Sequence, residues 1–385
     1  MTDEHTSRAN GCLLSGLNGS NPLGYLAALG TLRLVSHAWP DRKIRVAWEV
    51  SDGAYRPRIT SCESFTEKEL ITVAWDVLCH GTSASEREEA KQHRERLLQL
   101  RDEFDQQEAS LKKQKLNKKQ RDEKLKSLLA EQQLRLDAWR RIAHPQLQLG
   151  ADTTVPPEEF LIMEQNAAET ASHFHRAYAD FVVALGSSCF QQENGRIEDT
   201  ALRTMSGAGH QHFLGFMENL LLAVTPEHVR KSLLHDWVYD DPVQNLTMRW
   251  DPSDDARYAL QWRDPSGDPR RRSGGSVLGA NALAIAGLPL ISCIPTKSGL
   301  RTVGFRGRGA RDTYWIWPIW EPAIDMDTSR ALVAHSLVGR LHTTLRTAEE
   351  RRIRSDLAVL GVVRCFRSQR ITVGKIRSFT PAEAV

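Results

Sequence analysis

One long stretch of the chain, residues 86–141, contains neither proline nor glycine and is dominated by Glu, Arg, Lys, Gln and Leu. Apolar residues recur there at helical spacing in Leu97–Leu111 and again in Leu125–Trp139, whereas Lys112–Lys124 lacks an apolar stripe. This pattern predicts two helices that fold back on each other as an antiparallel coiled coil, with the tip near Leu116. Each arm would be roughly 35–40 Å long at about 1.5 Å per residue. We expect a separable insertion, because the two arms would bury each other.

The tip of the expected hairpin is strongly basic. Like charges that crowd together at one end of a thin helical pair repel each other. Two interpretations stay open: a charged helix surface that needs no partner, or a surface that contacts nucleic-acid phosphates. The candidate contacts are Lys112, Lys113, Lys115, Lys118 and Lys119.

A second constraint lies near the N-terminus, where an apolar run ending at Leu14 leads through turn residues to Pro22. Proline suits the first position of a helix, with Asn21 or Ser20 as its N-cap. The loop would present backbone N–H groups and the amides of Asn18 and Asn21 at a helix N-terminus, which favours anions. The loop is either part of an ordinary capped strand–turn–helix, or it contacts a phosphate or a base edge.

The rest of the chain alternates between helical and strand patterns. The sequence therefore predicts an α+β protein of mixed helices and small sheets with the hairpin inserted. Expected elements include a helix at Ala167–Leu185, a β-hairpin at Leu246–Trp262 and a helix at Thr328–Thr347. Four regions are expected: an α+β domain at 1–85, the hairpin at 86–141, a mainly helical acidic domain at 142–265 and an Arg-rich α+β region at 266–385.

Composition bounds the class of protein more loosely. The chain has 385 residues, a net charge of +3 and 41% hydrophobic residues, which is typical of a globular protein. No apolar run reaches about 18 residues, so we expect no membrane span and no membrane partner. The polar first ten residues lack the apolar core of a signal peptide, and the six cysteines include no C-x-x-C pair. We therefore expect a cytoplasmic protein with reduced thiols.

Charge is distributed unevenly along the chain. Residues 142–265 carry a net charge of −10, residues 266–385 carry +10, and 17 of the 19 basic residues in this last segment are arginine. Such a division indicates either internal docking or two different partners. Arginine favours planar, bidentate contact with phosphates or base edges.

The Arg-rich end is the strongest candidate for a binding surface. Its basic residues alternate with Phe305, Tyr314, Trp315 and Trp317, which suits a nucleic-acid groove with stacking platforms. The alternative is that these aromatic residues belong to the core and the arginines form a solvated rim. The candidate contacts are Arg301, Arg306, Arg308 and Arg311, with Arg270, Arg271 and Arg272 in a Gly/Ser-rich loop.

Catalytic motifs are missing from the sequence. It has no G-x-x-x-x-G-K-[ST] loop and no dinucleotide fingerprint after a strand. Histidines cluster in the middle of the chain, and His235-Asp236 has the form of a phosphohydrolase pair, but no complete ligand set accompanies it. We expect no catalytic residue, metal or cofactor, with a metal-dependent hydrolase or nuclease on these histidines as the alternative. The run Ser206–Gln211 contains glycines that either admit a packed backbone or present N–H groups to a ligand.

Several stretches carry a resemblance to a known family. They are Leu13–Val35 with its Gly-Ser-Asn-Pro-Leu-Gly turn, Ala201–Leu214, Gly279–Leu290, and Gly299–Gly304 followed by Trp317–Pro322. Together they resemble the large-subunit-like proteins of type I-G (formerly I-U) CRISPR systems, which sit with the Cascade surveillance complex. The resemblance spans most of the chain but leaves out residues 86–141.

The resemblance implies a non-catalytic, nucleic-acid-binding subunit in antiviral defence. Such subunits help recognise the motif beside the DNA target, hold the unwound strands and recruit the helicase-nuclease. The expected partners are other Cascade subunits, guide RNA and target DNA, with the helicase-nuclease as a further candidate. In this class the protein reads the short motif and guide pairing reads the sequence. The chain is short for a large subunit, so an accessory protein bound to the helicase-nuclease is an alternative.

Overall fold

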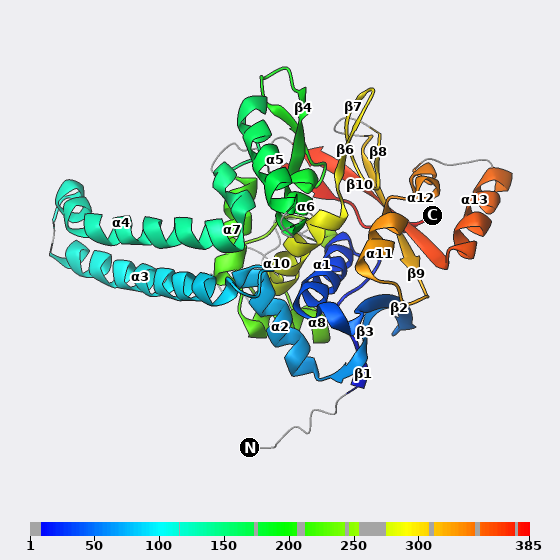
Figure 1. The fold of residues 1–385 in the computed structure, drawn as a ribbon, viewed down its shortest axis with the longest axis horizontal. Coiled ribbons are helices and arrows are strands. Elements are labelled where there is room, and N and C mark those ends of the chain that lie inside the picture. The colour runs from blue at the N-terminus through cyan, green and yellow to red at the C-terminus, as the bar shows by residue number, and fades with distance from the viewer. Residues whose placement is uncertain are drawn as a thin grey trace, which may run out of the picture.

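Two small-residue helices cross at the centre of the protein. The structure is a computed structural model that describes residues 9–114, 116–172, 176–205, 212–242, 246–253, 275–307, 312–342, 347–373 and 376–385. Within these residues, α1 (Pro22–Ala38) is buried from Pro22 to Val35, and α10 (Leu278–Gly287) is buried along its whole length. Helices and small antiparallel sheets surround this pair (Figure 1), which confirms the expected α+β class.

Glycine sets the distance between α1 and α10. A Cβ atom on Gly30 would lie 1.9 Å from the carbonyl oxygen of Leu283, and one on Gly287 would lie 2.4 Å from the carbonyl oxygen of Leu26. Real Cβ atoms do not approach backbone atoms so closely, so each helix needs glycine where it meets the other. The small residues of α1 therefore let α10 approach it closely.

The N-terminal segment forms a three-stranded sheet beside α1. Its strands are β1 (Ala9–Leu13), β2 (Arg45–Ser51) and β3 (Ala54–Phe65), in the order β1-β3-β2, and η1 (Pro40–Arg42) precedes β2. Asp52 and Gly53 turn the chain between β2 and β3 with positive φ. Helix α2 (Glu67–His80) follows, and Thr66 and Glu69 form a capping box at its N-terminus.

A long helical hairpin projects from the body (Figure 1). Helices α3 (Arg87–Lys113) and α4 (Lys118–Ala143) lie side by side, and Asn117 caps the second helix. The arms are tied by Arg96 Nε, which bonds to Glu131 at 3.1 Å, and by Gln132 Nε2, which donates to the carbonyl of Leu100 at 2.8 Å. The predicted hairpin is therefore present, while coiled-coil packing of its arms stays a prediction.

The base of the hairpin belongs to the main core. Arg94 Nη2 donates to three backbone carbonyls of the body, those of Leu221, Leu222 and Val224, at 2.9–3.2 Å. Trp139 is fully buried, and its indole N–H donates to the carbonyl of Cys79 at 2.8 Å. Ala90, Leu97, Leu136 and Trp139 join the continuous core cluster, whereas the buried leucines further out, Leu100, Leu111 and Leu125, do not. The arms bury only each other in their outer part.

The middle of the chain is mainly helical. Its elements are η2 (Pro145–Leu149), α5 (Pro157–Ser172), α6 (Arg176–Leu185), β4 (Gly186–Gln191), β5 (Ile197–Asp199), α7 (Phe213–Ala223) and α8 (Pro226–Leu234). The single helix expected at Ala167–Leu185 is wrong: two helices pack on each other, and the first begins at Pro157. Proline is compatible with the first turn of a helix, so Pro157 can begin α5.

The expected β-hairpin at Leu246–Trp262 fails in its first half, since residues 246–253 form no strand. The backbone N–H of Met248 donates to Asn281 Oδ1, and the indole of Trp250 donates to the carbonyl of Leu202, both at 2.8 Å. The alternation of apolar and polar residues there reflects burial of Met248 and Trp250 rather than strand pairing. Residues 254–262 lie outside the described part of the chain.

The C-terminal segment forms a five-stranded sheet. Its strands are β8 (Phe305–Arg306), β9 (Tyr314–Trp320), β10 (Val362–Val373), β11 (Ile376–Phe379) and β12 (Glu383–Ala384). A separate ribbon of β6 (Cys293–Thr296) and β7 (Gly299–Thr302) precedes it, after η4 (Leu288–Leu290). The helices are α11 (Met326–Val333), α12 (Ser336–Arg340) and α13 (Thr347–Val359). The single helix expected at Thr328–Thr347 is wrong. The chain is extended at His335, which ends the first helical stretch and occupies the N-cap position of α12.

One buried cluster draws residues from all four regions of the sequence. It runs from Cys12 through the hairpin base and the middle helices to Phe379. The division into four domains stays a prediction, but these regions share one core. No helix in the described ranges has the length and apolar character that a membrane crossing requires.

We predict that Gly30→Ala destabilises the protein by about 1–3 kcal/mol or more, because the new methyl group would overlap the backbone of α10. Urea denaturation monitored by tryptophan fluorescence measures the change.

Gly215→Ala is the matched control. Gly215 lies inside α7, where a Cβ would meet only ordinary contacts at 3.5 Å and beyond. Alanine is favoured over glycine in a helix interior by about 0.8–1.0 kcal/mol, so this variant should be unchanged or more stable. Equal effects of the two substitutions would contradict the close crossing of α1 and α10.

We also predict that the hairpin can be shortened but not removed. Replacing residues 104–128 with a short Gly/Ser linker should preserve cooperative thermal unfolding, because only the outer part of the arms is lost. Replacing residues 86–141 should abolish it, because Arg94 and Trp139 leave the core. A folded protein without residues 86–141 would show that these anchors are dispensable.

Candidate nucleic-acid interface

The turn before α1 uses its backbone donors inside the protein. The N–H of Gly16 donates to the carbonyl of Leu233 at 2.8 Å, and that of Gly19 donates to the carbonyl of Tyr55 at 2.8 Å. The N–H of Ser20 donates to Asn18 Oδ1 at 2.9 Å. These donors were the reason for expecting an anion at this loop. Because they are already bonded, the ordinary strand–turn–helix accounts for the motif.

Asn21 acts as the N-cap of α1. Its Oδ1 accepts from the N–H of Leu23 at 2.8 Å and from that of Gly24 at 3.3 Å. Its Nδ2 donates to Asp251 Oδ1 at 3.2 Å. Both ends of the amide are therefore engaged, and the structure gives Asn21 a structural role.

The aromatic residues of the C-terminal segment lie in the core. Phe305, Trp315 and Trp317 are buried, and the rings of Phe305 and Trp315 stack at 5.7 Å. The indole of Trp317 donates to the carbonyl of Gly19 at 2.8 Å. The expectation of stacking platforms is wrong for these three rings. The strand β9, which carries two of these rings, is buried on both faces from Trp315 to Trp320.

Two of the expected arginine contacts lie in the described part of the C-terminal segment. Arg301 is exposed on β7. Arg306 is half-buried on β8, and its Nη1 donates to the carbonyl of Phe305 at 2.7 Å. Burial lowers the pKa of Arg306, and the positive charge of Arg301 lowers it further. The other expected arginine contacts lie outside the described residues: Arg270, Arg271, Arg272, Arg308 and Arg311.

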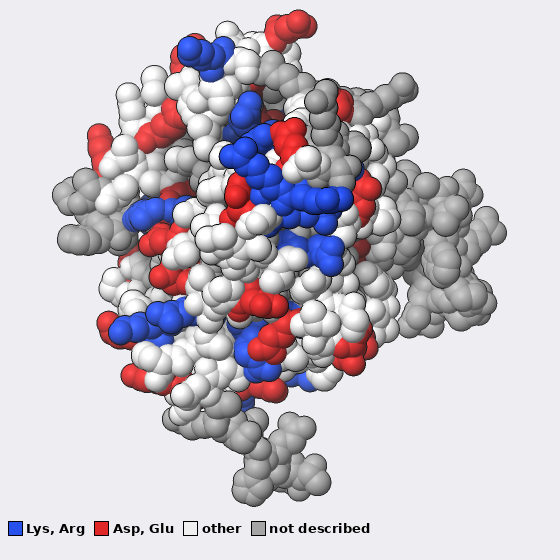
Figure 2. Space-filling view, turned by 90° about the vertical axis from the view of Figure 1, so that its right-hand side faces the viewer, with Lys and Arg blue, Asp and Glu red and all other residues white. Residues whose placement is uncertain are grey.

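A mixed basic surface lies over α12 and α13. Figure 2 shows Lys and Arg side chains gathered on this side of the molecule, with Asp and Glu among them. Three exposed arginines, Arg340, Arg352 and Arg354, form ion pairs with neighbouring carboxylates. Arg351 and Arg364 are exposed and form no ion pair with the described residues. None of these arginines was among the contacts expected from the sequence, because α13 was not expected.

The hairpin tip is the least neutralised basic surface among the predicted sites. In residues 110–126, seven described basic side chains oppose two acidic ones, which leaves +5. Lys112 Nζ bonds to Glu108 at 2.8 Å, the one ion pair formed by a described basic residue of this stretch. The candidates Lys113, Lys118 and Lys119 are exposed, and Lys115 lies outside the described residues.

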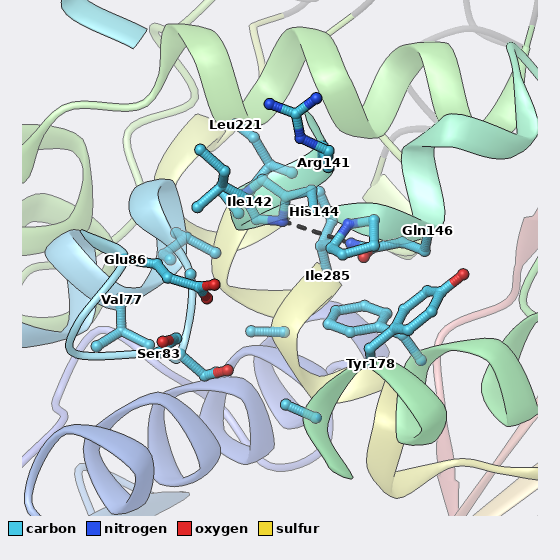
Figure 3. Close-up of a pocket in the computed structure, with 18 of the residues that line it drawn as sticks. Val77, Ser83, Glu86, Arg141, Ile142, His144, Gln146, Tyr178, Leu221 and Ile285 are labelled. Carbon is cyan, nitrogen blue, oxygen red and sulfur yellow. Dashed lines mark hydrogen bonds between the residues drawn. The ribbon is translucent and has the colours of Figure 1, made fainter. Parts of the chain in front are cut away.

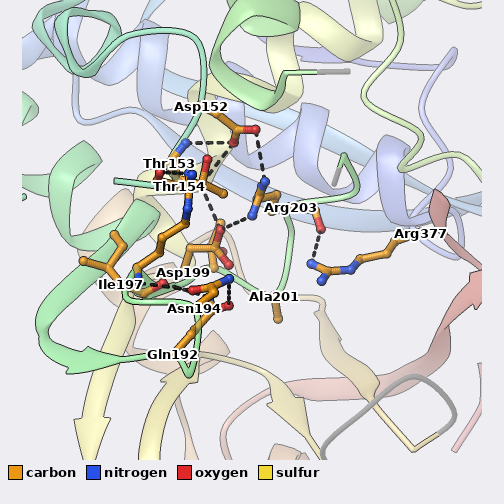
Figure 4. Close-up of polar contacts among 12 residues, drawn as sticks. Asp152, Thr153, Thr154, Gln192, Asn194, Ile197, Asp199, Ala201, Arg203 and Arg377 are labelled. Carbon is orange, nitrogen blue, oxygen red and sulfur yellow. Dashed lines mark hydrogen bonds and ion pairs between the residues drawn. The ribbon is translucent and has the colours of Figure 1, made fainter. Parts of the chain in front are cut away.

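A buried arginine network joins the acidic middle of the chain to the C-terminal sheet (Figure 4). Arg203 donates to Asp199 Oδ2 at 2.7 Å and to Asp152 Oδ2 at 3.0 Å. Arg377 donates to the carbonyl of Arg203 at 3.3 Å, and Arg370 donates to that of Ala201 at 2.9 Å. Burial lowers the pKa of Arg370 to about 10. Arg370 and Arg377 of the C-terminal segment thus dock on backbone carbonyls of the middle segment. The opposite charges of the two segments meet directly where Arg330 pairs with Asp180 at 2.9 Å.

The histidines in the described part of the central cluster make separate contacts. His212 Nδ1 lies 3.8 Å from Asp152, His228 Nε2 lies 3.6 Å from Asp241, and His235 Nε2 lies 2.5 Å from Arg230 Nη1. Across the described ranges, no group of three or more His, Cys, Asp or Glu side chains could hold a metal ion. His173, His175, His210 and the whole Ser206–Gln211 run lie outside those ranges.

Comparison with known proteins identifies no family. No protein-family model matches the chain, and no curated protein matches it significantly.

We predict that Asn21→Ala destabilises the protein by about 0.5–2 kcal/mol through loss of the N-cap, without changing its affinity for DNA. Asn21→Ser, which keeps a capping oxygen, should recover most of the stability. Chemical denaturation and fluorescence anisotropy with labelled DNA measure the two quantities. A loss of DNA affinity in both variants, at unchanged stability, would show that Asn21 contacts DNA.

Proposed function

We propose that this protein is a non-catalytic nucleic-acid-binding subunit of a CRISPR surveillance complex. The observation that carries the proposal is the exposed hairpin tip, where the described residues of 110–126 carry a net charge of +5. Its lysines lie at the far end of helices of 27 and 26 residues. At about 1.5 Å per residue the tip stands roughly 40 Å from the base.

The chemistry of the tip suits a phosphate backbone. Lysine ammonium groups act as point charges on flexible stems, so they contact phosphates without a fixed geometry. Such contacts position a nucleic acid but carry no sequence information. We expect the tip to bind DNA and RNA with little sequence preference. Any reading of a flanking motif belongs to another surface or to another subunit.

The wider assignment rests on the resemblance to Cascade large-subunit-like proteins. It names guide RNA, target DNA and other Cascade subunits as partners, in the cytoplasm, and the helicase-nuclease as a further candidate. A basic tip on a projecting hairpin can reach a strand that the main body does not touch. Purification of the tagged protein with its native neighbours tests this assignment directly, since a surveillance complex would bring guide RNA with it.

We predict that changing Lys112, Lys113, Lys118 and Lys119 to Gln weakens binding to duplex DNA and flattens its salt dependence. Each phosphate contact contributes about 0.9 to the slope of log affinity against log salt. Loss of four contacts should therefore reduce the slope by roughly 3.6. Anisotropy titrations with one labelled duplex over a series of salt concentrations measure the slope.

The matched control changes four exposed lysines elsewhere, Lys43, Lys68, Lys231 and Lys297, to Gln. Both variants lose the same formal charge, so a general effect of net charge would appear in both. We expect the control to keep nearly the parental slope. Identical slopes in parent and tip variant would remove the tip from the interface, and with it the main support for the proposed function.

A further inference from the structure

A cavity of about 330 Å³ lies between the hairpin base and the central helices (Figure 3). Helices α1, α2, α5, α6 and α10 and the segment 141–148 line it. The inner wall includes the buried residues Arg33, Leu78, His144 and Ile285, while Glu86 and Asn166 are exposed at the rim. A cavity of this size with a mostly apolar wall and a few polar groups is typical of a small-molecule site.

Arg33 is the unusual member of the wall. Its side chain is 1% exposed, and its Nη2 donates to the carbonyl of Ala177 at 3.2 Å. Its Nε has no hydrogen-bond partner in the described part of the chain. The ring of Phe181 lies 5.0 Å from the guanidinium carbon. Ala177 and Phe181 also line the cavity, which places the guanidinium beside it.

The charge of Arg33 is poorly neutralised by the protein. Asp180 is near enough to raise its pKa, but burial has the larger effect and lowers that pKa to about 10. Asp180 is already shared, since it bonds to Arg330 at 2.9 Å and to Arg176 at 3.4 Å. Arg33 therefore stays charged at neutral pH without a carboxylate of its own. A buried charge without its own counter-ion destabilises the folded protein unless a bound anion neutralises it.

The opposite wall adds polar groups but no further buried charge, because the charged lining residues Arg141 and Glu86 are exposed. Burial lowers the pKa of His144 to about 3, so its imidazole is neutral near pH 7. His144 Nδ1 lies 3.4 Å from Gln146 Nε2. Val77, Leu78 and Ile285 supply apolar surface. The cavity thus offers one buried cation, neutral hydrogen-bonding groups and an apolar wall, with the exposed Arg141 and Glu86 at its edge.

We propose that this cavity binds a small organic anion, with its phosphate or carboxylate group on Arg33 and its apolar body against Leu78 and Ile285. The site is independent of the hairpin tip and of nucleic-acid binding. A ligand bound there would contact the helices that anchor the hairpin.

Phenyl phosphate and benzoate are suitable probes, because each joins a planar apolar ring to an anion. Thermal melts and isothermal titration of the full chain should show that at least one of them binds. Inorganic phosphate has the anionic group without the ring, and phenol has the ring without the anionic group. Each should bind at least about tenfold more weakly. The better of phenyl phosphate and benzoate identifies the anion as phosphate or carboxylate. No binding of either at millimolar concentration would overturn the proposal.

Arg33→Met tests the role of the guanidinium. The apolar side chain replaces a poorly paired buried charge, so the variant should melt at or above the parental temperature without ligand. Its affinity for the better probe should fall at least about tenfold. Arg352→Met, on the exposed surface of α13, is the matched control and should bind like the parent.

Asn166→Trp keeps the test decisive if Arg33→Met does not fold. This rim position is exposed on α5, so a large side chain should block the opening without disturbing the core. We expect loss of probe binding at an unchanged melting temperature. Parental affinity in folded Asn166→Trp or Arg33→Met would place the probe elsewhere and contradict the site.

Discussion

The contact between α1 and α10 is the constraint on which the rest of the structure depends. Gly30 and Gly287 bring two backbones together at a distance that any side chain would prevent. Around this pair lie α2, α8 and α11, and the N-terminal sheet lies beside α1. Residues more than 250 positions apart in sequence meet here, so the ends of the chain must fold as one unit. Formation of this non-local contact carries a loop-closure cost that later packing repays.

The turn before α1 extends the same junction. Its backbone bonds to β3 and to the end of α8, and its Gly19 carbonyl accepts from Trp317 in the C-terminal sheet. A motif that is conspicuous in sequence can therefore be conspicuous for structural reasons. Glycine, asparagine and proline are required here because three parts of the chain meet at one turn. The same residue types would favour an anion only if their donors were unoccupied.

Local patterns predicted the elements whose boundaries depend on neighbouring residues. The predicted cap at Asn21 is of this kind and is confirmed. Elements whose pattern reflects long-range contacts were predicted poorly: Met248 and Trp250 alternate because they are buried, and β9 is apolar on both faces. The basic tip was visible from charge alone. The cavity beside Arg33 was not, because its wall combines seven separate parts of the chain, including Leu221 of α7.

The length of the hairpin has an electrical consequence. The Debye length is about 8 Å at physiological ionic strength, whereas the tip stands roughly 40 Å from the body. The electrostatic potential at the tip is therefore set by its own lysines, because salt screens the −10 charge of residues 142–265 over that distance. An acidic middle segment and a basic hairpin tip can therefore coexist in one chain without neutralising each other. The hairpin separates two surfaces of opposite sign by distance, and its anchored base keeps that separation fixed.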